Sequence, residues 1–175
     1  MSNAEAANAG STSHSASFVL PDPDATDRLG AALAATLPAR AVLYLRGDLG
    51  AGKSSLARAL LRALGVQGAV KSPTYTLVER YAVGGGEAAH LDLYRIAGGD
   101  ELGFLGLDDL ADARLWLVEW PERGGAGLPP ADLDLALGVD GMGRRAVLRA
   151  GSAVGQAWLA GLARDPSCEA FVRPG

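Results

Sequence analysis

The 175-residue chain contains a single cysteine, few aromatic residues and no long apolar run. Cys168 cannot form an internal disulfide and has no companion at metal-ligand spacing, so we expect neither a disulfide scaffold nor a zinc site, and a reducing cytoplasmic setting. No apolar stretch reaches the ~20 residues of a membrane span, and the beginning lacks the pattern of a secretory signal. We therefore expect no membrane association.

Basic clusters are also missing. The formal net charge is −4 and no dense run of lysine or arginine occurs, so tight binding to nucleic acid by this chain alone is not expected. Hydrophobic residues make up 49% of the chain, which is enough for a core, and the length predicts one domain. We expect this domain over 18–165, after a disordered leader at 1–17 rich in small residues and before a tail at 166–175.

What is present is a glycine-rich loop at 47–54. It reads Gly-Asp-Leu-Gly-Ala-Gly-Lys-Ser and matches the G-x-x-x-x-G-K-[ST] pattern of phosphate-binding loops. The apolar run 41–45 before it indicates a buried strand. After it, leucines recur every four residues from Leu56 to Leu64, which indicates an amphipathic helix that Gly65 is placed to cap. A chance turn with a surface lysine does not explain this strand–loop–helix context.

The loop residues suit a nucleoside triphosphate. Backbone N–H groups at a helix N-terminus attract phosphate, and Gly47, Gly50 and Gly52 let the backbone turn tightly and approach the ligand. We expect Lys53 to reach the β- and γ-phosphates and Ser54 to offer its hydroxyl to a magnesium ion, Mg2+. Guanine-specific proteins of this class commonly use an Asn-Lys-x-Asp loop. Because the only asparagines lie within the first eight residues, ATP is preferred over GTP.

The rest of the chain alternates between strand and helix signals. We predict an α/β, P-loop NTPase-like fold of three layers, with a mixed, mostly parallel central sheet that includes an antiparallel hairpin. Apart from the loop's own strand and helix, the expected elements are a strand at 18–20, a helix from about Thr26 that ends before Pro38, a hairpin of 76–83 and 89–94 joined by glycines 84–86, a short helix at 100–105, a buried parallel strand at 115–118, a strand pair at 132–139 and 144–149, and a last helix around Trp158.

Two acidic residues stand at strand ends, where a triphosphatase needs carboxylates for Mg2+ and for the attacking water. Asp92 lies in His-Leu-Asp-Leu-Tyr-Arg, and Glu119 directly follows a buried strand. The alternative for Asp92 is a solvated hairpin acid. That alternative is weaker for Glu119, because an unpaired acid beside a buried strand is costly. Thr74 lies where γ-phosphate sensors often occur, although a plain proline-containing turn fits equally well, and His90 fits either a proton acceptor or a structural histidine.

Four motifs in this order resemble one family. They are the loop at 47–54, Lys-Ser-Pro-Thr-Tyr-Thr-Leu-Val-Glu at 71–79, His-Leu-Asp-Leu-Tyr-Arg at 90–95 and Val-Glu-Trp-Pro-Glu at 118–122. Together they are similar to the TsaE (YjeE) ATPases of bacteria, over roughly residues 18–150. The resemblance implies a small P-loop ATPase that works with the TsaB–TsaD heterodimer. With a threonylcarbamoyl-adenylate synthase, that system makes threonylcarbamoyladenosine in tRNA.

In that family TsaE does not perform the carbamoyl transfer, and its ATPase is implied to reset TsaB–TsaD between rounds. It meets tRNA only indirectly, through the complex, and turns over slowly alone. Motif by motif, the resemblance assigns residues as follows: Gly50, Ala51, Gly52, Lys53, Ser54 and Ser55 to the phosphates, Ser54 and Glu119 to Mg2+, Asp92 to catalysis, Thr74 to a switch-like loop, Trp120 next to the site, and Thr26 and Arg144 near the nucleotide. The family usually has threonine where this chain has Ser54, and both supply a hydroxyl.

Two other functions fit the same loop. A small-molecule kinase usually carries an arginine-rich lid and an acceptor pocket, and the glycine stretch 84–86 is too short for a lid. A nucleotide-gated interaction module would bind ATP to fix a docking surface without hydrolysing it. A screen of phosphate acceptors and a single-turnover assay separate these functions from an ATPase.

Overall fold

The computed structural model describes residues 14–169 and 172–173, and within them one eight-stranded sheet has the order β3-β4-β5-β2-β6-β7-β1-β8. The strands are β1 (Ser15–Leu20), β2 (Ala41–Arg46), β3 (Val78–Val83), β4 (Gly86–Asp92), β5 (Leu115–Glu119), β6 (Leu133–Asp140), β7 (Gly143–Ala150) and β8 (Val172–Arg173). The α-helices are α1 (Pro23–Ala35), α2 (Lys53–Ala63), α3 (Ala153–Ala163) and α4 (Pro166–Glu169), and the 3-10 helices are η1 (Gly99–Phe104), η2 (Leu107–Leu110), η3 (Pro121–Arg123) and η4 (Gly125–Gly127).

The sheet is parallel at its centre and antiparallel on both sides. Strands β4, β5, β2 and β6 run parallel to one another, while β3 pairs antiparallel with β4, as the expected hairpin requires. The α/β, P-loop NTPase-like fold with a mixed sheet is therefore confirmed. The parallel part is smaller than expected, at three of the seven pairings, because the tight turn after β6 reverses the chain into β7, which then pairs with β1.

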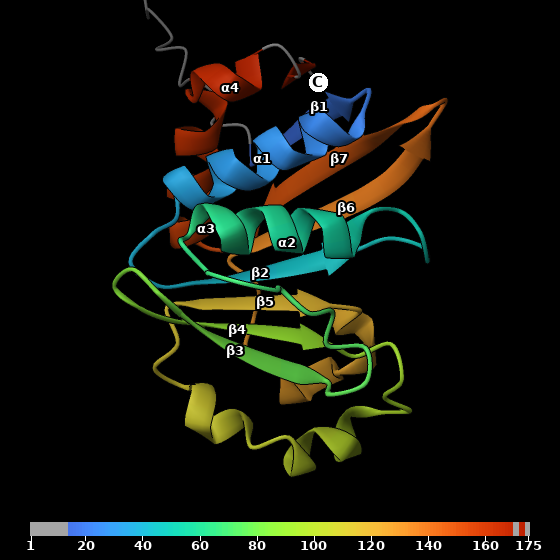
Figure 1. Ribbon diagram of the computed structural model, residues 1–175, viewed down its shortest axis with the longest axis vertical. Helices are drawn as coiled ribbons and strands as arrows, with labels where there is room; N and C mark the ends of the chain where they lie inside the picture. The colour runs from blue at the N-terminus through green and yellow to red at the C-terminus, as the bar shows by residue number, and fades with distance from the viewer. Residues whose placement is uncertain (1–13, 170–171, 174–175) are drawn as a thin grey trace, which may run out of the picture.

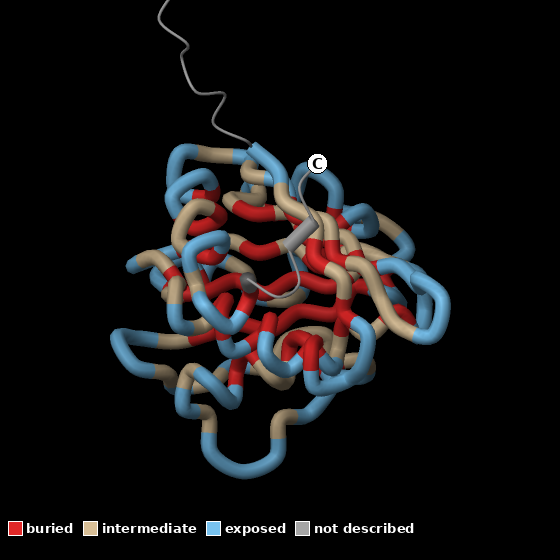
Figure 2. Tube along the Cα trace, turned by 90° about the horizontal axis from the view of Figure 1, so that it is seen from above, coloured by how far each residue is buried: buried red, intermediate tan, exposed pale blue. Residues whose placement is uncertain are grey.

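The two faces of the sheet are covered differently. Helices α1 and α2 lie over one face, as Figure 1 shows, and α3 joins them through Trp158, whose indole N–H donates to the Leu33 carbonyl at 3.2 Å. The main buried cluster lies between these helices and the sheet. Figure 2 shows the buried residues of the chain, in red, gathered at the centre of the molecule. On the other face, η1, η2 and the segment around Leu128 pack against β4, β5, β2 and the start of β3. The third layer thus consists of short 3-10 turns.

Helix α1 begins at Pro23, three residues before the position expected from the sequence. Asp22 caps it, because its carboxylate accepts the Ala25 N–H at 2.7 Å, and Pro23 occupies the first turn, where a missing N–H costs nothing. Proline therefore starts this helix, whereas the sequence analysis placed the start at about Thr26. The shift places Thr26 on the first turn, where it is 7% exposed.

The ends of the domain differ from the expected boundaries. Residues 15–17, expected in the leader, belong to β1, which pairs with β7 from Ser15 onward, while residues 1–13 lie outside the described part. In the expected tail, α4 buries Cys168, which is 1% exposed, and burial raises the pKa of its thiol. Within residues 14–169 and 172–173, none of the helices combines the length and the apolar character needed to cross a bilayer.

Candidate functional site

The glycine-rich loop joins β2 to α2 and leaves the start of that helix open. Gly47 has a φ of 142°, and a Cβ there would overlap the Leu137 carbonyl oxygen, so only glycine fits. Gly52 is the N-cap of α2 with a φ of 106°, and no side chain caps the helix. The first backbone N–H groups of α2 thus lack a side-chain acceptor. Together with the helix dipole they form an anion-binding site.

Lys53 is held at the first position of α2 and is 5% exposed. Its ammonium donates to the carbonyl oxygens of Gly47 at 2.6 Å and Asp48 at 3.0 Å, and it lies 4.3 Å from the centroid of the Trp120 ring. Burial lowers the pKa of Lys53, and the carboxylate of Glu119 opposes that shift. The amine is therefore fixed inside the loop, within reach of an anion bound there.

The two expected acids end neighbouring parallel strands, in register with each other. Asp92 is the last residue of β4 and Glu119 the last of β5, and they are 5% and 1% exposed. The hydroxyl of Ser54 lies 3.2 Å from one Glu119 oxygen and 3.4 Å from the other. The predicted placement of both acids at the carboxyl edge of the sheet, beside the loop, is what the structure contains.

Asp92 sits in a polar but desolvated position. Its Oδ1 accepts the Tyr94 N–H at 3.0 Å, and the Thr74 hydroxyl lies 3.4 Å from Oδ2. Burial raises the pKa of Asp92 above the ordinary aspartate value, the Tyr94 amide opposes this, and the nearby Glu119 charge reinforces it. A carboxyl whose pKa is raised in this way binds a proton more readily than a free aspartate.

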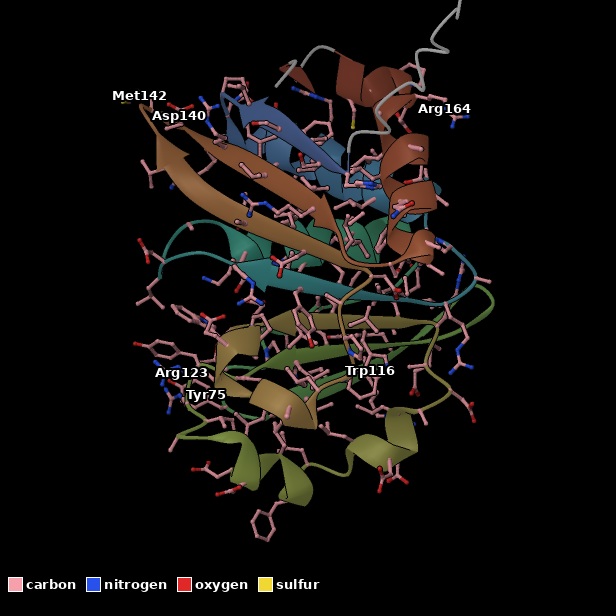
Figure 3. The ribbon with its side chains drawn as sticks, turned by 180° about the vertical axis from the view of Figure 1, so that it is seen from behind. Tyr75, Trp116, Arg123, Asp140, Met142 and Arg164 are labelled. Atoms are coloured by element: carbon pink, nitrogen blue, oxygen red, sulfur yellow. The ribbon has the colours of Figure 1, made fainter. Side chains whose placement is uncertain are left out.

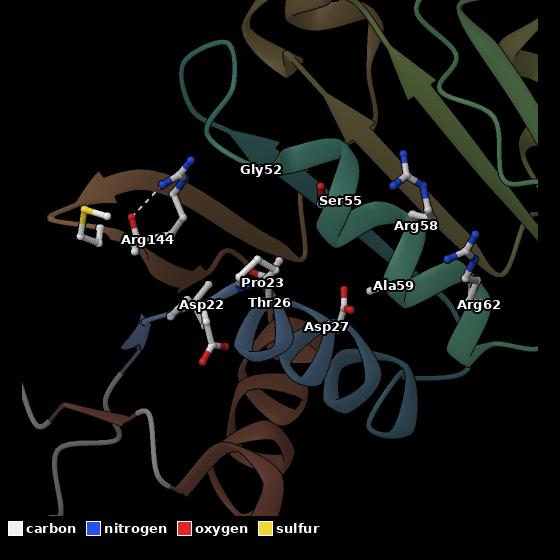
Figure 4. Close-up of a pocket in the computed structure, with 13 residues that line it drawn as sticks. Asp22, Pro23, Thr26, Asp27, Gly52, Ser55, Arg58, Ala59, Arg62 and Arg144 are labelled. Atoms are coloured by element: carbon white, nitrogen blue, oxygen red, sulfur yellow. Dashed lines mark hydrogen bonds between the residues drawn. The ribbon is translucent and has the colours of Figure 1, made fainter.

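The remaining loop residues line two adjoining cavities. The smaller, of about 320 Å³, is lined by Leu49, Gly50, Gly52, Lys53, Ser54, Ser55, Thr74, Asp92, Tyr94, Arg95, Glu119 and Trp120. The larger, of about 610 Å³, lies between the first turns of α1, one side of α2 and the start of β7 (Figure 4), and Thr26 and Arg144 line it. Both cavities include Gly52 and Ser55. A ligand with a phosphate chain and a nucleoside can therefore lie across the two.

Arg144 ties β7 to the loop. Its Nε donates to the carbonyl of Ala51 at 3.1 Å and its Nη2 to that of Gly50 at 3.3 Å, while Nη1 donates to Gly143 at 2.9 Å. Ala51 is itself 2% exposed, so it faces the core and offers only its backbone. Gly47 and Ala51 thus line neither cavity and act on the shape of the loop.

Aromatic and arginine side chains surround the mouth of the smaller cavity. The rings of Tyr94 and Trp120 are 5.0 Å apart, and Arg95 lies 4.3 Å from the centroid of Tyr75. Figure 3 shows Tyr75 and Arg123 on the same side of the molecule. Trp120 adopts a left-handed backbone with a φ of 57°, which is unusual for a bulky residue and marks stored strain.

The donor set beside the loop fits Mg2+. In the part of the chain that the structure describes, no three histidine, cysteine or acidic residues gather as a metal centre. Ser54 and Glu119 instead offer a hydroxyl and a carboxylate in contact with each other. Mg2+ prefers hard oxygen ligands and is usually bound through one or two protein groups, phosphates and water. The chemistry of this pair matches what a protein contributes to such a site.

Several residues at the site were not predicted as site residues. Leu49, Tyr94 and Arg95 line the smaller cavity, and Met142 lines the larger one from the tip of the β6–β7 hairpin. Tyr94 and Arg95 follow Asp92 in the chain after a single leucine, so proximity to a candidate acid was a usable signal. Met142 carried no signal, because its place at the larger cavity depends on the pairing of β7 with β1.

The fold and the loop define the class of this molecule as P-loop NTPase-like. The model of the protein family named threonylcarbamoyl adenosine biosynthesis protein TsaE matches residues 20–147. The chain belongs to the TsaE family.

Individual relatives agree with this assignment. A tRNA threonylcarbamoyladenosine biosynthesis protein TsaE from Haemophilus influenzae is 50% identical over 93 residues, which cover 53% of this chain and 59% of that protein. The protein of the same name from Synechocystis is 42% identical over 120 residues, which cover 63% and 73%. The crystal structure of Bacillus subtilis YdiB superposes with a TM-score of 0.70 at 26% identity, covering 86% of this chain and 95% of YdiB. The match thus spans between about three fifths and three quarters of the two curated relatives.

Proposed function

We propose that this protein is a Mg2+-dependent ATPase that hydrolyses ATP to ADP and phosphate as a subunit of the machinery for threonylcarbamoyladenosine in tRNA. One observation carries the proposal. Lys53 and Ser54 on α2 and the two buried acids that end β4 and β5 converge on the open N-terminus of a helix. That arrangement suits a triphosphate with a metal, and a water poised beside it.

The loop residues, Thr74 and the two buried acids of the smaller cavity each have a role in this proposal. Lys53 leaves its carbonyl partners to contact the phosphates, and Gly50, Gly52 and Ser55 contribute backbone or hydroxyl donors. Asp92 orients the attacking water and accepts its proton, to which the raised pKa of this carboxyl is suited. The Thr74 hydroxyl lies 3.4 Å from Asp92, so this γ-phosphate sensor contacts the catalytic carboxylate directly.

The metal would be held by Ser54 and Glu119. Bound Mg2+ supplies positive charge that stabilises the phosphates as negative charge develops on them. The Ser54 hydroxyl lies 3.2 Å from a Glu119 carboxylate oxygen, so the two proposed ligands are next to each other before any metal binds. Asp92 is left for the water, because it shares its hydrogen bonds with Tyr94 and Thr74 and not with Ser54.

The nucleoside is proposed to occupy the larger cavity, with Thr26 on one wall and Arg144 on another. No asparagine occurs among residues 14–175, so the guanine-reading loop of GTP-specific proteins has no counterpart there. This supports ATP over GTP as the substrate.

We further propose that the protein acts with the TsaB–TsaD heterodimer in the cytoplasm, where ATP and tRNA occur together, and that it meets tRNA only through that complex. The names of the relatives support the pathway. In residues 14–169 and 172–173 no arginine occupies the smaller cavity other than Arg95, which stacks on Tyr75. Hydrolysis by the chain alone is therefore expected to be slow, and the partners are expected to raise it.

The test is release of phosphate from ATP by the purified chain, alone and with TsaB–TsaD, with GTP as the control nucleotide. We expect slow ATP turnover that rises with the partners, loss of turnover in Lys53→Ala, and wild-type rates in Arg145→Met, whose guanidinium pairs with Asp140 away from the loop. Equal rates with and without TsaB–TsaD contradict the partner assignment. ATP binding without ADP formation under single-turnover conditions identifies a nucleotide-gated module instead.

A further inference from the structure

We propose that His90 is a positioning residue for Glu119, which fixes the orientation of this carboxylate for Mg2+. The inference rests on the proposed function, because it assumes that Glu119 holds the metal. It concerns a residue for which the sequence left two roles open, a proton acceptor or a structural histidine. In the structure the imidazole is directed at Glu119.

The side chains of His90 and Glu119 meet on neighbouring strands of the sheet, in the buried interior. His90 lies on β4, two residues before Asp92 and therefore on the same face of that strand, and β5 beside it ends at Glu119. Its Nε2 is 2.8 Å from Oε1 of Glu119, and the two side chains are each 2% exposed. A hydrogen bond of this length between two buried groups is well formed and shielded from competing water.

Glu119 is the sole polar partner of the imidazole within the described part of the chain. The other ring nitrogen, Nδ1, is buried without a hydrogen-bond partner there. Burying a polar ring with one nitrogen unsatisfied is costly, and an apolar side chain of similar size would fill the space without that cost. The hydrogen bond to Glu119 is therefore the feature of His90 that packing alone does not explain.

The contact acts on a flexible ligand. A glutamate side chain has three rotatable bonds, and fixing them costs conformational entropy. His90 holds Oε1 at 2.8 Å while Ser54 approaches both oxygens, at 3.4 Å and 3.2 Å, so the carboxylate is oriented toward the Ser54 hydroxyl. The cost of ordering Glu119 then falls on folding of the domain and not on metal binding. Groups that orient a metal ligand in this way commonly change metal affinity by 10- to 100-fold.

The experiment compares His90→Gln with His90→Met. Glutamine places an amide N–H2 where Nε2 of the ring lies, whereas methionine fills a similar volume with no donor. For each full-length variant, binding of a fluorescent ATP analogue is measured against Mg2+ concentration and again in excess EDTA, and the melting temperature is recorded. We expect His90→Met to raise the half-saturating Mg2+ concentration about 10-fold or more. The affinity of His90→Met for the nucleotide in EDTA should stay within about 2-fold of the wild-type value. For His90→Gln, the half-saturating Mg2+ concentration should stay within about 3-fold of the wild-type value.

Parallel measurements on Glu119→Gln separate the two proposals. If Glu119→Gln loses Mg2+ dependence while His90→Met keeps it, the positioning role is overturned and the proposed function stands. If Glu119→Gln leaves Mg2+ dependence unchanged, the proposed metal site itself is wrong. Equal losses in both His90 variants, accompanied by weaker binding in EDTA, mean that His90 serves packing and overturn the inference.

A third variant covers failure of the methionine protein to fold. His90→Asn keeps a polar amide, but its shorter side chain places the amide near the position of Nδ1, out of reach of Glu119. The inference then requires a weakened Mg2+ response in His90→Asn and a preserved one in His90→Gln. The same Mg2+ response in these two variants overturns it.

Discussion

Arg144 offers the sharpest test of how the loop is preorganised. We consider Arg144→Met, which keeps most of the aliphatic stem and removes the guanidinium. In the wild-type protein two of its nitrogens donate to the carbonyl oxygens of Ala51 and Gly50, at 3.1 Å and 3.3 Å. Without these bonds the loop loses its link to β7, and binding of a nucleotide has to order it.

The size of the effect follows from these two contacts. Hydrogen bonds from a charged donor contribute about 1.5–3 kcal/mol when buried and less when partly exposed, as Arg144 is, so we take about 1 kcal/mol each. The total of about 2 kcal/mol corresponds to a dissociation constant for the nucleotide that is about 30-fold larger. Because the contacts lie on the loop and not beside Asp92, we expect the same loss for ADP and for ATP.

The assay is equilibrium binding of a fluorescent nucleotide, with urea unfolding measured in parallel. Arg145→Met is the matched control, since Arg145 is the next residue on the same strand and pairs with Asp140 near the hairpin tip. We expect the control to bind as the wild type does. If Arg144→Met also binds within about 2-fold of the wild type, the loop does not depend on this arginine and the reasoning is refuted.

Three further predictions concern single residues. Asp92→Asn should abolish hydrolysis and retain ATP binding. Because burial raises the pKa of Asp92, ionising it destabilises the fold, so in urea unfolding this variant should be more stable than the wild type at neutral pH, with the gain vanishing as pH falls through the raised pKa to the ordinary value. Nucleotide binding should change Trp120 fluorescence, because Lys53 turns away from the ring, and Trp120→Phe should remove that signal while the other two tryptophans remain. Gly47→Ala should lower the free energy of unfolding by at least about 2 kcal/mol, because the added Cβ overlaps with a β6 carbonyl oxygen. The control Gly84→Ala has open space around it and should not lower it. Equal stabilities of the two variants in urea unfolding contradict the prediction.

Local patterns were sufficient for the centre of the site. The strand and helix around the loop follow from a short apolar run and a four-residue leucine repeat, and both occur where they were expected. The placement of Asp92 and Glu119 was also predictable, because an acid directly after a strand in a parallel sheet reaches the same edge as the loop. What these two acids do chemically stays a prediction.

Other features depend on contacts between distant segments. The hydrogen bond of His90 to Glu119 requires β4 and β5 to be neighbours in one register, which no pattern within either strand specifies. The left-handed backbone of Trp120 could not be predicted from the sequence either, because this conformation is rare for tryptophan and is imposed by its surroundings. The start of α1 was placed three residues too late for a local reason, since Asp22 caps the helix and the proline that follows it takes the first helical position.

The position of β1 has a consequence for synthesis of the chain. Strand β1 pairs with β7 and β8, which both come from the last part of the sequence, so it has no partner in the sheet while the ribosome makes the glycine-rich loop and the strands around it. Strands β2, β4, β5 and β6 have their mutual partners earlier in the chain, so we expect β1 to join the sheet last. The same adjacency of first and last strands makes the domain a good candidate for circular permutation, with a linker joining β8 to β1 and new ends opened in the glycine turn of the β3–β4 hairpin.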